Sequence, residues 1–581
     1  MSTTTETAAQ ALVRAMLEQG ITTVFGTVGH GNLPLIDAIA GEPRMRFVSA
    51  YHEQVAIHAA DAYFRSSGRV AAVVTTVGPG ATNLATGLGD ALLDSSAVLV
   101  ITGGVPSEYV QRDPLQALSV IADNTQAEIF RPLTKRVIEV GSAGDLVREF
   151  SRAYAEAVNG RPGPVLLHVP LDYFSAPVEH APAPARRMRF SPHADPQAIS
   201  EAAELVRDAA RPVLYCGGGA LAPGAPEAVL ALVNETGIPV VTTMSGQGVI
   251  DEDHDLALGT TGVVGTRTGN AAIREADVII AVGTRFPEMD SSSWRPEYFA
   301  GFPPARLVHI DIDPATIDRV FPATVGVCAD AGPAVSDLAR ALDGFRVPGS
   351  WTDRLATAKR EWHAELAETR TVASVPFEPA YLLTRLRRLI SDDTVLVSGV
   401  GVRHAVAQHF PVRRPRTLVV ASGFGTMGQE VAAPLGVAEA GIPVVAVIGD
   451  GALLACLAAL PTAVAADEDL TWIVLDNGGY ASIAIYQSKH FGRRLGTDFI
   501  DDDGDPYSID YAALASSFGA WTATVTSADE LDGAVEAALA HRGPAVVVVP
   551  VTGQPRIQGT GHWDVNDIFA AGAAIAREAT S

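Results

Sequence analysis

Short apolar runs alternate with longer segments of helical period along nearly the whole chain. Residues 444–448 and 472–475 are such runs: each is continuous, about as long as a strand, and followed by small or polar residues. Strands that are apolar on both faces are typical of parallel sheets covered by helices on each side. The pattern therefore predicts an α/β protein with parallel sheets.

Two proline-rich or polar breaks interrupt this alternation. They are "SAPVEHAPAPARRMRF" at 175–190 and "DGFRVPGSWT" at 343–352. A chain of 581 residues exceeds the size at which one hydrophobic core keeps growing. The breaks therefore predict three domains, at 1–180, 190–345 and 360–560.

The first and last thirds close in a similar way. "GRPGPVLLHVPLDYF" ends the first and "HRGPAVVVVPVTG" ends the last, and each reads as a turn followed by a buried strand. Many α/β domains end like this, so the similarity has two readings. If it is a true repeat, the outer domains share one fold.

Composition and charge limit the classes of molecule that we expect the protein to bind. The chain is 48% hydrophobic and 19% charged, and its net charge is −24. Binding nucleic acid or an anionic membrane needs a basic face, so we expect neither partner and predict a small substrate. The beginning of the chain lacks a basic region followed by an apolar run, and no apolar stretch is long enough to cross a bilayer, so we expect a soluble, cytoplasmic protein. The three cysteines match no metal-binding spacing.

Oxygen-bearing residues follow two neighbouring strands of the last third. Asp450 lies between two glycines after the first strand, and Asn477 follows the next. Parallel α/β sheets bind ligands at the carboxyl ends of their strands. Magnesium prefers oxygen ligands and is often shared with phosphates, so Asp450, Asn477 and the carbonyl of Gly479 form a predicted magnesium site.

A helix predicted to begin near Ala452 supports a phosphate at the same edge. The backbone N–H groups of Gly451 and Ala452 and the positive end of the helix would face it. A competing interpretation is a nicotinamide dinucleotide fold with "YCGGGALAPG" at 215–224 as its glycine turn. That segment lacks a clean G-x-G-x-x-G, and no acidic residue follows at the expected distance.

Together these motifs resemble the thiamine diphosphate enzymes. The Gly-Asp-Gly and asparagine turn is similar to their diphosphate and magnesium motif, and "AYHEQVAIHAADAYFR" at 50–65 to their segment with the catalytic glutamate. "TTVGPGATNLATGL" at 75–88 and "FGTMGQEVAAPLG" at 424–436 fit as well, and "ADVIIAVGTRF" resembles the central domain of acetolactate synthase. The resemblance implies three doubly wound parallel-sheet domains: pyrimidine-binding, central and diphosphate-binding.

The resemblance also assigns roles. Glu53 would hydrogen-bond the pyrimidine ring of the cofactor and so promote loss of the proton at C2 of the thiazolium, which gives a carbanion that attacks a carbonyl. Met427 would be the wedge that bends the cofactor, although a methionine more often fills a core. The carbonyl of Gly425 would contact the pyrimidine amino group. The family builds its active site between two subunits, which implies a homodimer or homotetramer.

Four further residues are candidates for the active site. His30, in "VGHGNLPLIDAI", could pass protons to a developing alkoxide or could cap its turn. Gln116, in "RDPLQ", could reach an active site from the neighbouring subunit or lie in a solvated loop. Arg403 and His404, in "SGVGVRHAV", occupy a loop that contacts diphosphate in the family, or are simply exposed.

The motifs that indicate the cofactor are compatible with more than one reaction. "GHGN", "RDPLQ", "GTRF" and "DNGGYASI" are similar to trihydroxycyclohexanedione hydrolase, and these motifs favour C–C cleavage of a 1,2-dione. The alternative is an acetolactate synthase-like enzyme that decarboxylates a 2-oxo acid and joins the fragment to a second carbonyl. "GTRF" is also compatible with a bound FAD. A cofactor-binding relative without activity is the third hypothesis, which the retention of Glu53, Asp450 and Asn477 together disfavours.

Overall fold

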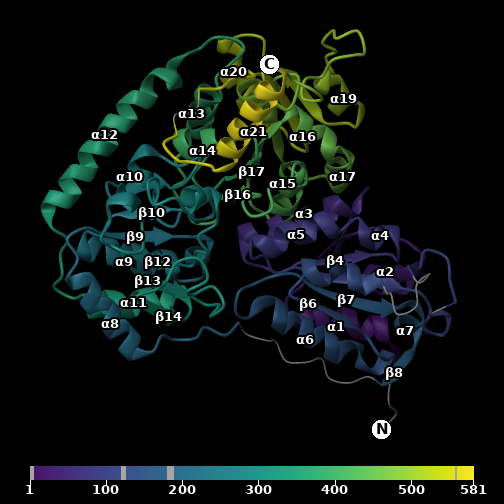
Figure 1. Ribbon diagram of the computed structural model, residues 1–581. Coiled ribbons are helices and arrows are strands. Elements are labelled where there is room, and N and C mark those ends of the chain that lie inside the picture. The colour runs from purple at the N-terminus through teal and green to yellow at the C-terminus, as the bar shows by residue number, and fades with distance from the viewer. Residues whose placement is uncertain (1–4, 111, 119–125, 180–188, 557–558, 581) are drawn as a thin grey trace.

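The computed structural model describes residues 5–110, 112–118, 126–179, 189–556 and 559–580. It contains three six-stranded sheets whose paired strands are all parallel, each flanked by helices. Figure 1 shows them as three lobes, with the N-terminal lobe in purple and blue, the central one in teal and the C-terminal one in green and yellow. The predicted α/β class with three doubly wound parallel-sheet domains is confirmed.

The N-terminal sheet has the strand order β3-β2-β4-β5-β7-β6. Its strands are β2 (Thr23–Gly26), β3 (Arg46–Ser49), β4 (Ala72–Thr75), β5 (Leu99–Gly104), β6 (Arg136–Glu139) and β7 (Val165–Pro170). The helices are α1 (Ala8–Glu18), α2 (Leu33–Ala40), α3 (Glu53–Ser67), α4 (Pro79–Thr82), α5 (Ala85–Leu93), α6 (Leu146–Val158) and α7 (Leu171–Ser175).

The central sheet has the order β11-β10-β9-β12-β13-β14. Its strands are β9 (Pro212–Cys216), β10 (Val240–Thr242), β11 (Ala257–Thr260), β12 (Val278–Val282), β13 (Arg306–Asp311) and β14 (Val325–Cys328), with helices α8 (Pro196–Arg207), α9 (Ala225–Thr236), α10 (Arg267–Glu275) and α11 (Ala331–Ala341). This is the strand order of dinucleotide-binding folds. The second strand, β10, is followed by Thr243, so the acidic residue that would bind a ribose is missing here, as the sequence indicates.

The C-terminal sheet has the order β16-β15-β17-β18-β20-β19. Its strands are β15 (Val395–Ser398), β16 (Leu418–Val420), β17 (Val444–Gly449), β18 (Thr471–Asp476), β19 (Trp521–Thr524) and β20 (Ala545–Pro550). The helices are α13 (Pro379–Leu389), α14 (Arg403–His409), α15 (Gln429–Glu439), α16 (Asp450–Ala455), α17 (Ala459–Ala466), α18 (Ala481–Phe491), α19 (Tyr511–Ser517), α20 (Ala528–Ala540) and α21 (Val565–Thr580).

The outer sheets share one topology. Numbered within each sheet, both follow the order 2-1-3-4-6-5, and the similar closing segments form the sixth strand, β7 in one and β20 in the other. The repeat seen in the sequence is therefore real. Helix α3 of the N-terminal domain packs against α15 of the C-terminal domain, and one hydrophobic core includes residues of both domains.

The two breaks are less irregular than the sequence predicts. Within the first, β8 (Pro177–Glu179) pairs antiparallel with β1 (Thr5–Thr7), and residues 180–188 lie outside the described part of the chain. The predicted end of the second break, at residue 352, is wrong, because α12 (Gly349–Thr371) begins inside the break. Trp351 explains this early start: it is buried, and its indole N–H donates to the carbonyl of Pro212 at 3.2 Å. The domain limits themselves stay predictions.

Candidate active site

Asp450 joins the carboxyl ends of two neighbouring strands. It directly follows β17, is 1% exposed, and begins α16, two residues before the predicted helix start. Its Oδ1 accepts the N–H of Gly451 at 2.7 Å. Its Oδ2 accepts the N–H groups of Asn477, Gly478 and Gly479 at 3.1, 2.8 and 3.3 Å. One carboxylate therefore fixes the turn that follows β18.

The same turn leaves one oxygen unsatisfied. Oδ1 of Asn477 is buried and has no hydrogen-bond partner in the described structure. Burial raises the pKa of Asp450, and the N–H groups of Gly451, Asn477 and Gly478 oppose this effect. A buried amide oxygen beside a buried carboxylate is a donor set that fits a hard cation such as Mg²⁺.

Two glycines allow the chain to close tightly around this turn. A Cβ on Gly451 would lie 2.4 Å from the ring of Tyr480, and a Cβ on Gly479 would lie 2.2 Å from the carbonyl oxygen of Thr497. The N–H of Tyr480 donates to that same carbonyl at 2.7 Å. Side chains at either glycine would push the turn away from Asp450.

Glu53 is the first residue of α3 and lies at the carboxyl edge of the N-terminal sheet. Its two carboxylate oxygens are held separately: Thr27 Oγ1 donates to Oε1 at 2.8 Å and Asn83 Nδ2 donates to Oε2 at 2.9 Å. Thr27 and Asn83 are site residues that the sequence did not predict. Both lie in or next to motifs that it contains, since Thr27 directly precedes "VGHGN" and Asn83 lies within "VGPGATNL".

His30 belongs to the loop that Thr27 begins. The N–H of Gly31 donates to Thr76 Oγ1 at 3.0 Å, and Asn32 Nδ2 donates back to the carbonyl of Thr27 at 2.8 Å. These bonds fix the loop beside Glu53, and the His30 side chain is exposed. His30 therefore lies on the same edge of the sheet as Glu53.

Gln116 is exposed and has a left-handed backbone, with φ of +65°. Its carbonyl oxygen packs so closely on Gly78 that a Cβ there would lie 2.4 Å away. A Cβ on the nearby Gly80 would lie 3.4 Å from Glu53 Oε1. The Gln116 backbone thus contacts the glycine-rich segment next to Glu53, and its side chain is solvated in the single chain.

Gly425 and Met427 lie in the loop 421–428 between β16 and α15. Gly425 has φ of +74°, and the side chains of Phe424 and Met427 are 51% and 42% exposed. The loop rests on the N-terminal domain of its own chain, because the N–H of Gly423 donates to Asp94 Oδ1 at 3.1 Å. Met427 therefore does not fill the core, which removes the main alternative to its proposed role.

Arg403 and His404 begin α14, directly after the loop 399–402 that follows β15. Both are partly buried, so the alternative of two simply exposed side chains is wrong. Burial lowers the pKa of Arg403, while Asp290 and Tyr486 favour its charged form. Burial and Arg403 lower the pKa of His404 to about 4, so His404 is neutral at pH 7, and its buried Nε2 has no partner among the described residues.

A cavity of about 870 Å³ opens where the three domains meet, lined mostly by the N-terminal and central domains and also by residues between Arg416 and Gly423 of the C-terminal domain. Two glycine turns at strand ends line it, Gly217 to Gly219 after β9 and Gly283 after β12, together with Arg161 and Arg285. The turns touch, since a Cβ on Gly217 would lie 2.4 Å from the carbonyl oxygen of Gly283. The volume of the cavity falls in the range of cofactor-binding sites, about 300 to 1,000 Å³.

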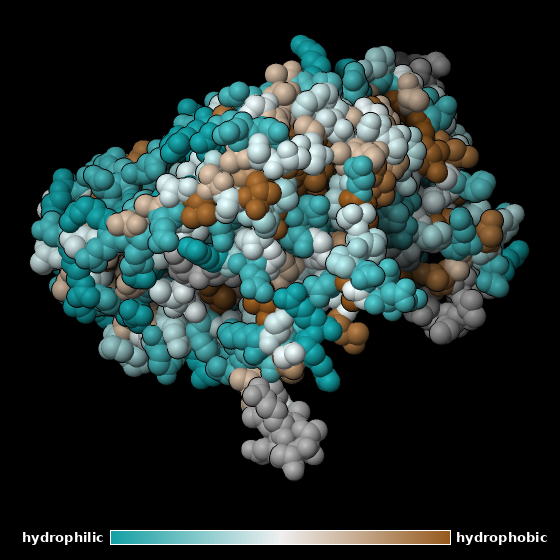
Figure 2. Space-filling model, turned by 90° about the horizontal axis from the view of Figure 1, so that it is seen from above, coloured by the Kyte–Doolittle hydropathy of each residue, from teal (hydrophilic) through white to brown (hydrophobic). Residues whose placement is uncertain are grey.

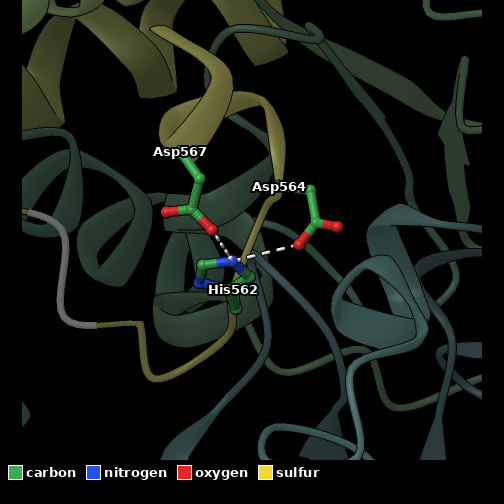
Figure 3. Close-up of side chains that lie close together, drawn as sticks. All are labelled: His562, Asp564 and Asp567. Carbon is green, nitrogen blue, oxygen red and sulfur yellow. Dashed lines mark hydrogen bonds and ion pairs between the residues drawn. The ribbon is translucent and has the colours of Figure 1, made fainter. Parts of the chain in front are cut away.

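A separate cluster of metal-binding residue types lies at the start of α21. His562 Nε2 lies 3.1 Å from Asp564 Oδ1 and 3.0 Å from Asp567 Oδ2, as Figure 3 shows. Asp564 also accepts a hydrogen bond from Arg295 Nε at 2.7 Å. These ion pairs account for the cluster, and we assign no metal to it.

The predicted catalytic and diphosphate-binding residues form separate groups in one chain. Within the described residues, no hydrogen bond or ion pair joins Glu53 to Asp450 or to Asn477.

No helix among the described residues combines the length and apolar character needed to cross a bilayer.

Comparisons with known protein families give one match for each of the three sheets. The chain matches the thiamine pyrophosphate enzyme N-terminal TPP binding domain over residues 6–126, the central domain over 199–338 and the C-terminal TPP binding domain over 399–549. Thiamine pyrophosphate is another name for thiamine diphosphate.

The chain is similar to several acetolactate synthases. The probable acetolactate synthase large subunit of Methanocaldococcus jannaschii is 31% identical over 95% of this chain and 94% of the relative. The large subunit of Corynebacterium glutamicum is 32% identical, over 94% and 87%. Acetolactate synthase 2 of Zea mays is also 32% identical, over 94% and 85%. The chain therefore belongs to the thiamine pyrophosphate-dependent enzymes and is similar to the acetolactate synthases among them.

Proposed function

We propose that this protein is a carboligase of the acetolactate synthase type, which decarboxylates a 2-oxo acid and joins the remaining fragment to a second carbonyl compound. The observation that carries the proposal is the similarity to acetolactate synthases along nearly the whole chain. The relatives thus favour the alternative of the sequence analysis over the dione hydrolase, which no relative named above supports.

Glu53 is the proton-handling group in this proposal. Thiamine diphosphate supplies a ring carbon whose proton can be lost, so that the carbon attacks a carbonyl. Thr27 and Asn83 each donate to one oxygen of Glu53 and so fix the plane of its carboxylate. A carboxylate with a fixed position can share a proton with the cofactor ring without first reorganising.

Magnesium and the diphosphate are assigned to the other group of residues. Asp450 supplies the charge, and the unsatisfied Oδ1 of Asn477 supplies a neutral oxygen. The carbonyl of Gly479 is the third candidate ligand, and the backbone N–H groups at Gly451 and Ala452 are candidates to face the phosphates. Asp450 would then position the metal and the turn together.

We further propose that the active enzyme is a homodimer or a larger homo-oligomer. Large apolar side chains beside Thr27 and Glu53 and in the loop 421–428 are solvent-exposed in the single chain: Val28 50%, Tyr51 67%, Phe424 51% and Met427 42%. Figure 2 shows hydrophobic residues in brown forming groups on the face seen from above. Exposed apolar groups of this kind mark interaction surfaces, and a second copy would bring its Glu53 to this Asp450.

The 870 Å³ cavity is the site we assign to a dinucleotide cofactor, with FAD as the first candidate. Its glycine turns leave room for a pyrophosphate to approach the backbone, and Arg161 and Arg285 supply positive charge. FAD would give the purified protein the yellow colour of a flavin, and a protein that stays colourless after incubation with FAD and removal of the free cofactor would contradict this assignment.

The assay that tests the proposed function compares two substrates. Purified protein with thiamine diphosphate and Mg²⁺ should release carbon dioxide from pyruvate and form a new C–C product. Opening of cyclohexane-1,2-dione without carbon dioxide would instead support the hydrolase. Loss of either activity in a Glu53→Gln variant would show that it belongs to this site, and the surface variant Glu536→Gln on α20 is the matched control.

A further inference from the structure

Glu430 is a buried carboxyl group that the proposed chemistry does not use. It is the second residue of α15, within "MGQE", and is 2% exposed. It lies between two loops at the carboxyl edge of the C-terminal sheet. One is the loop 399–402, which leads to Arg403 and His404, and the other is the loop 421–428, which carries Gly425 and Met427.

The carboxyl group of Glu430 contacts both loops. Its Oε2 accepts the N–H of Gly428 at 3.0 Å. Its Oε1 lies against the other loop, because a Cβ on Gly399 would be 3.2 Å from it. The backbone N–H of Val400 also acts on this carboxyl as a hydrogen-bond donor. Hydrogen bonds from N–H groups to a carboxylate are among the stronger ones in proteins.

A third element of the candidate site meets the same point. Cys456 follows the last residue of α16, the short helix that Asp450 begins. It packs on Gly428, where a Cβ would lie 3.0 Å from the Cys456 Cβ. Burial, assisted by Glu430, raises the pKa of the Cys456 thiol to about 12, so the thiol stays neutral. Glu430 thus lies where the two loops and the end of α16, the helix that Asp450 begins, come together.

The position of Glu430 is costly for the fold. Burial raises its pKa to about 7, while the N–H groups of its own residue, Gly428 and Val400 lower it. Among the groups of the described residues that act on its pKa, none is a side-chain cation. A buried carboxyl without a cation destabilises a protein relative to an apolar side chain of similar size. Packing alone therefore does not account for a glutamate here.

We infer that Glu430 is a positioning residue that holds the loop 399–402 and the loop 421–428 at the spacing needed to seat thiamine diphosphate. The inference rests on the proposed function, because it takes these loops to contact the two ends of the cofactor. The hydrogen bonds that Glu430 accepts come from backbone N–H groups of the loops, so we expect it to act through Gly425, Met427 and Arg403.

The test measures cofactor binding and cofactor reactivity separately from stability. The proteins are wild type, Glu430→Gln, Glu430→Ala and the control Glu439→Gln, which removes a carboxylate from the far end of α15, where Glu439 pairs with Arg46. Calorimetry gives the Kd of thiamine diphosphate at saturating Mg²⁺. Deuterium exchange at C2 of the bound cofactor, followed by NMR, reports its placement. Thermal unfolding without cofactor reports stability.

Glu430→Ala should raise the Kd about 10- to 100-fold, because hydrogen bonds to both loops are lost. Glu430→Gln keeps one acceptor oxygen and should raise the Kd less, about 3- to 10-fold, with C2 exchange at saturating cofactor slowed about 10-fold. The control should change neither quantity, and the cofactor-free variants should unfold within a few degrees of wild type. Since glutamine has the shape of glutamate, Glu430→Gln keeps the test valid if the alanine variant does not fold.

The outcomes separate the two proposals. If wild type binds the cofactor and both Glu430 variants bind and exchange as it does, the inference about Glu430 is wrong and the proposed function stands. A variant whose only defect is a lower unfolding temperature would likewise reduce Glu430 to a structural role. If wild type itself does not bind thiamine diphosphate with Mg²⁺, the proposed function fails, and the inference fails with it.

Discussion

Asp450 Oδ2 accepts the backbone N–H of Asn477 at 3.1 Å, while the side-chain Oδ1 of Asn477 is buried and has no partner among the described residues. The two residues are thus joined through the backbone of one and the carboxylate of the other, and the amide oxygen is left available. Buried polar atoms are rarely left unsatisfied in native proteins. The pair is organised for a ligand that completes it, and Mg²⁺ is the ligand we propose.

Removal of either member of this pair should weaken metal-dependent cofactor binding. We expect Asp450→Ala to raise the Kd of thiamine diphosphate with Mg²⁺ by at least about 100-fold, because both the charge and the anchor of the turn are lost. Asn477→Ala loses one neutral ligand and should raise it about 10-fold. Calorimetry measures both, and Asp529→Asn, at an exposed position, is the control. Unchanged binding in Asp450→Ala would contradict the metal assignment.

Glu53→Gln should separate catalysis from binding. Glutamine can accept only one of the hydrogen bonds from Thr27 and Asn83 and cannot share a proton, so kcat should fall about 100- to 10,000-fold. The Kd of the cofactor should change less than about threefold, because the groups assigned to the diphosphate are unaltered. Steady-state kinetics and calorimetry together check this, and a fall in affinity that explains the whole loss of activity would refute the catalytic role.

Two inactive variants should complement each other if active sites form between subunits. In a mixture of Glu53→Gln and Asp450→Asn, a mixed dimer contains one site with both native residues. Random exchange of subunits would make half the dimers mixed and restore about a quarter of the wild-type activity. The mixture is dissociated, reassociated and assayed. Activity no higher than that of the separate variants, in dimers shown to be mixed, would place both residues of a site in one chain.

The contact between α3 and α15 should tolerate no side chain at Gly436. A Cβ there would lie 1.8 Å from the carbonyl oxygen of Ala59, which is backbone and cannot move without displacing α3. Gly436→Ala should lower the free energy of unfolding by about 3 kcal/mol or more. Gly533→Ala, in α20, meets nothing within 4 Å and should be neutral or stabilising by up to about 1 kcal/mol. Chemical denaturation of both variants checks this, and equal effects would show that the contact is not rigid.

Asp90 should make stability depend on pH. Burial raises the pKa of its carboxyl to about 8, so the folded protein holds a proton there that the unfolded chain releases above about pH 4. The contribution is therefore fully present below that pH and is lost as pH rises through 8. Between pH 5.5 and 7.5, wild type should lose up to about 1 kcal/mol per pH unit more than Asp90→Asn.

Denaturant titrations of the two proteins across that range measure the difference. Burial also lowers the pKa of His58 to about 3, which favours stability as pH rises below 6.5. His58 Nδ1 lies 3.5 Å from Asp90 Oδ2, so Asp90→Asn also changes the surroundings of His58, and the part of the range above pH 6.5 is the one that reports on Asp90 alone. Parallel stability curves would show that Asp90 is ionised in the folded state.

Local patterns were enough to predict the strands and the two residues, Asp450 and Asn477, of the proposed metal site. The runs before Asp450 and Asn477 are apolar on every residue, and the parallel sheet that such runs predict brings strand ends to one edge. The repeat between the outer domains was visible for the same reason, since strand and turn are local features. The start of α12 was missed because tertiary packing of Trp351, rather than local propensity, holds that segment.

The sequence by itself determined the fold class, the cofactor family and the identity of Glu53, Asp450 and Asn477 as candidate residues. These conclusions depend on short motifs, and the residues and spacing of a short motif can be read from the sequence without knowledge of the surrounding structure. Only the tertiary structure decided that Thr27 and Asn83 hold Glu53, that the Asn477 amide oxygen is left unsatisfied, and that Glu430 is buried between two loops. These features join residues far apart in the chain or depend on the exclusion of water, and neither property is encoded in a local pattern.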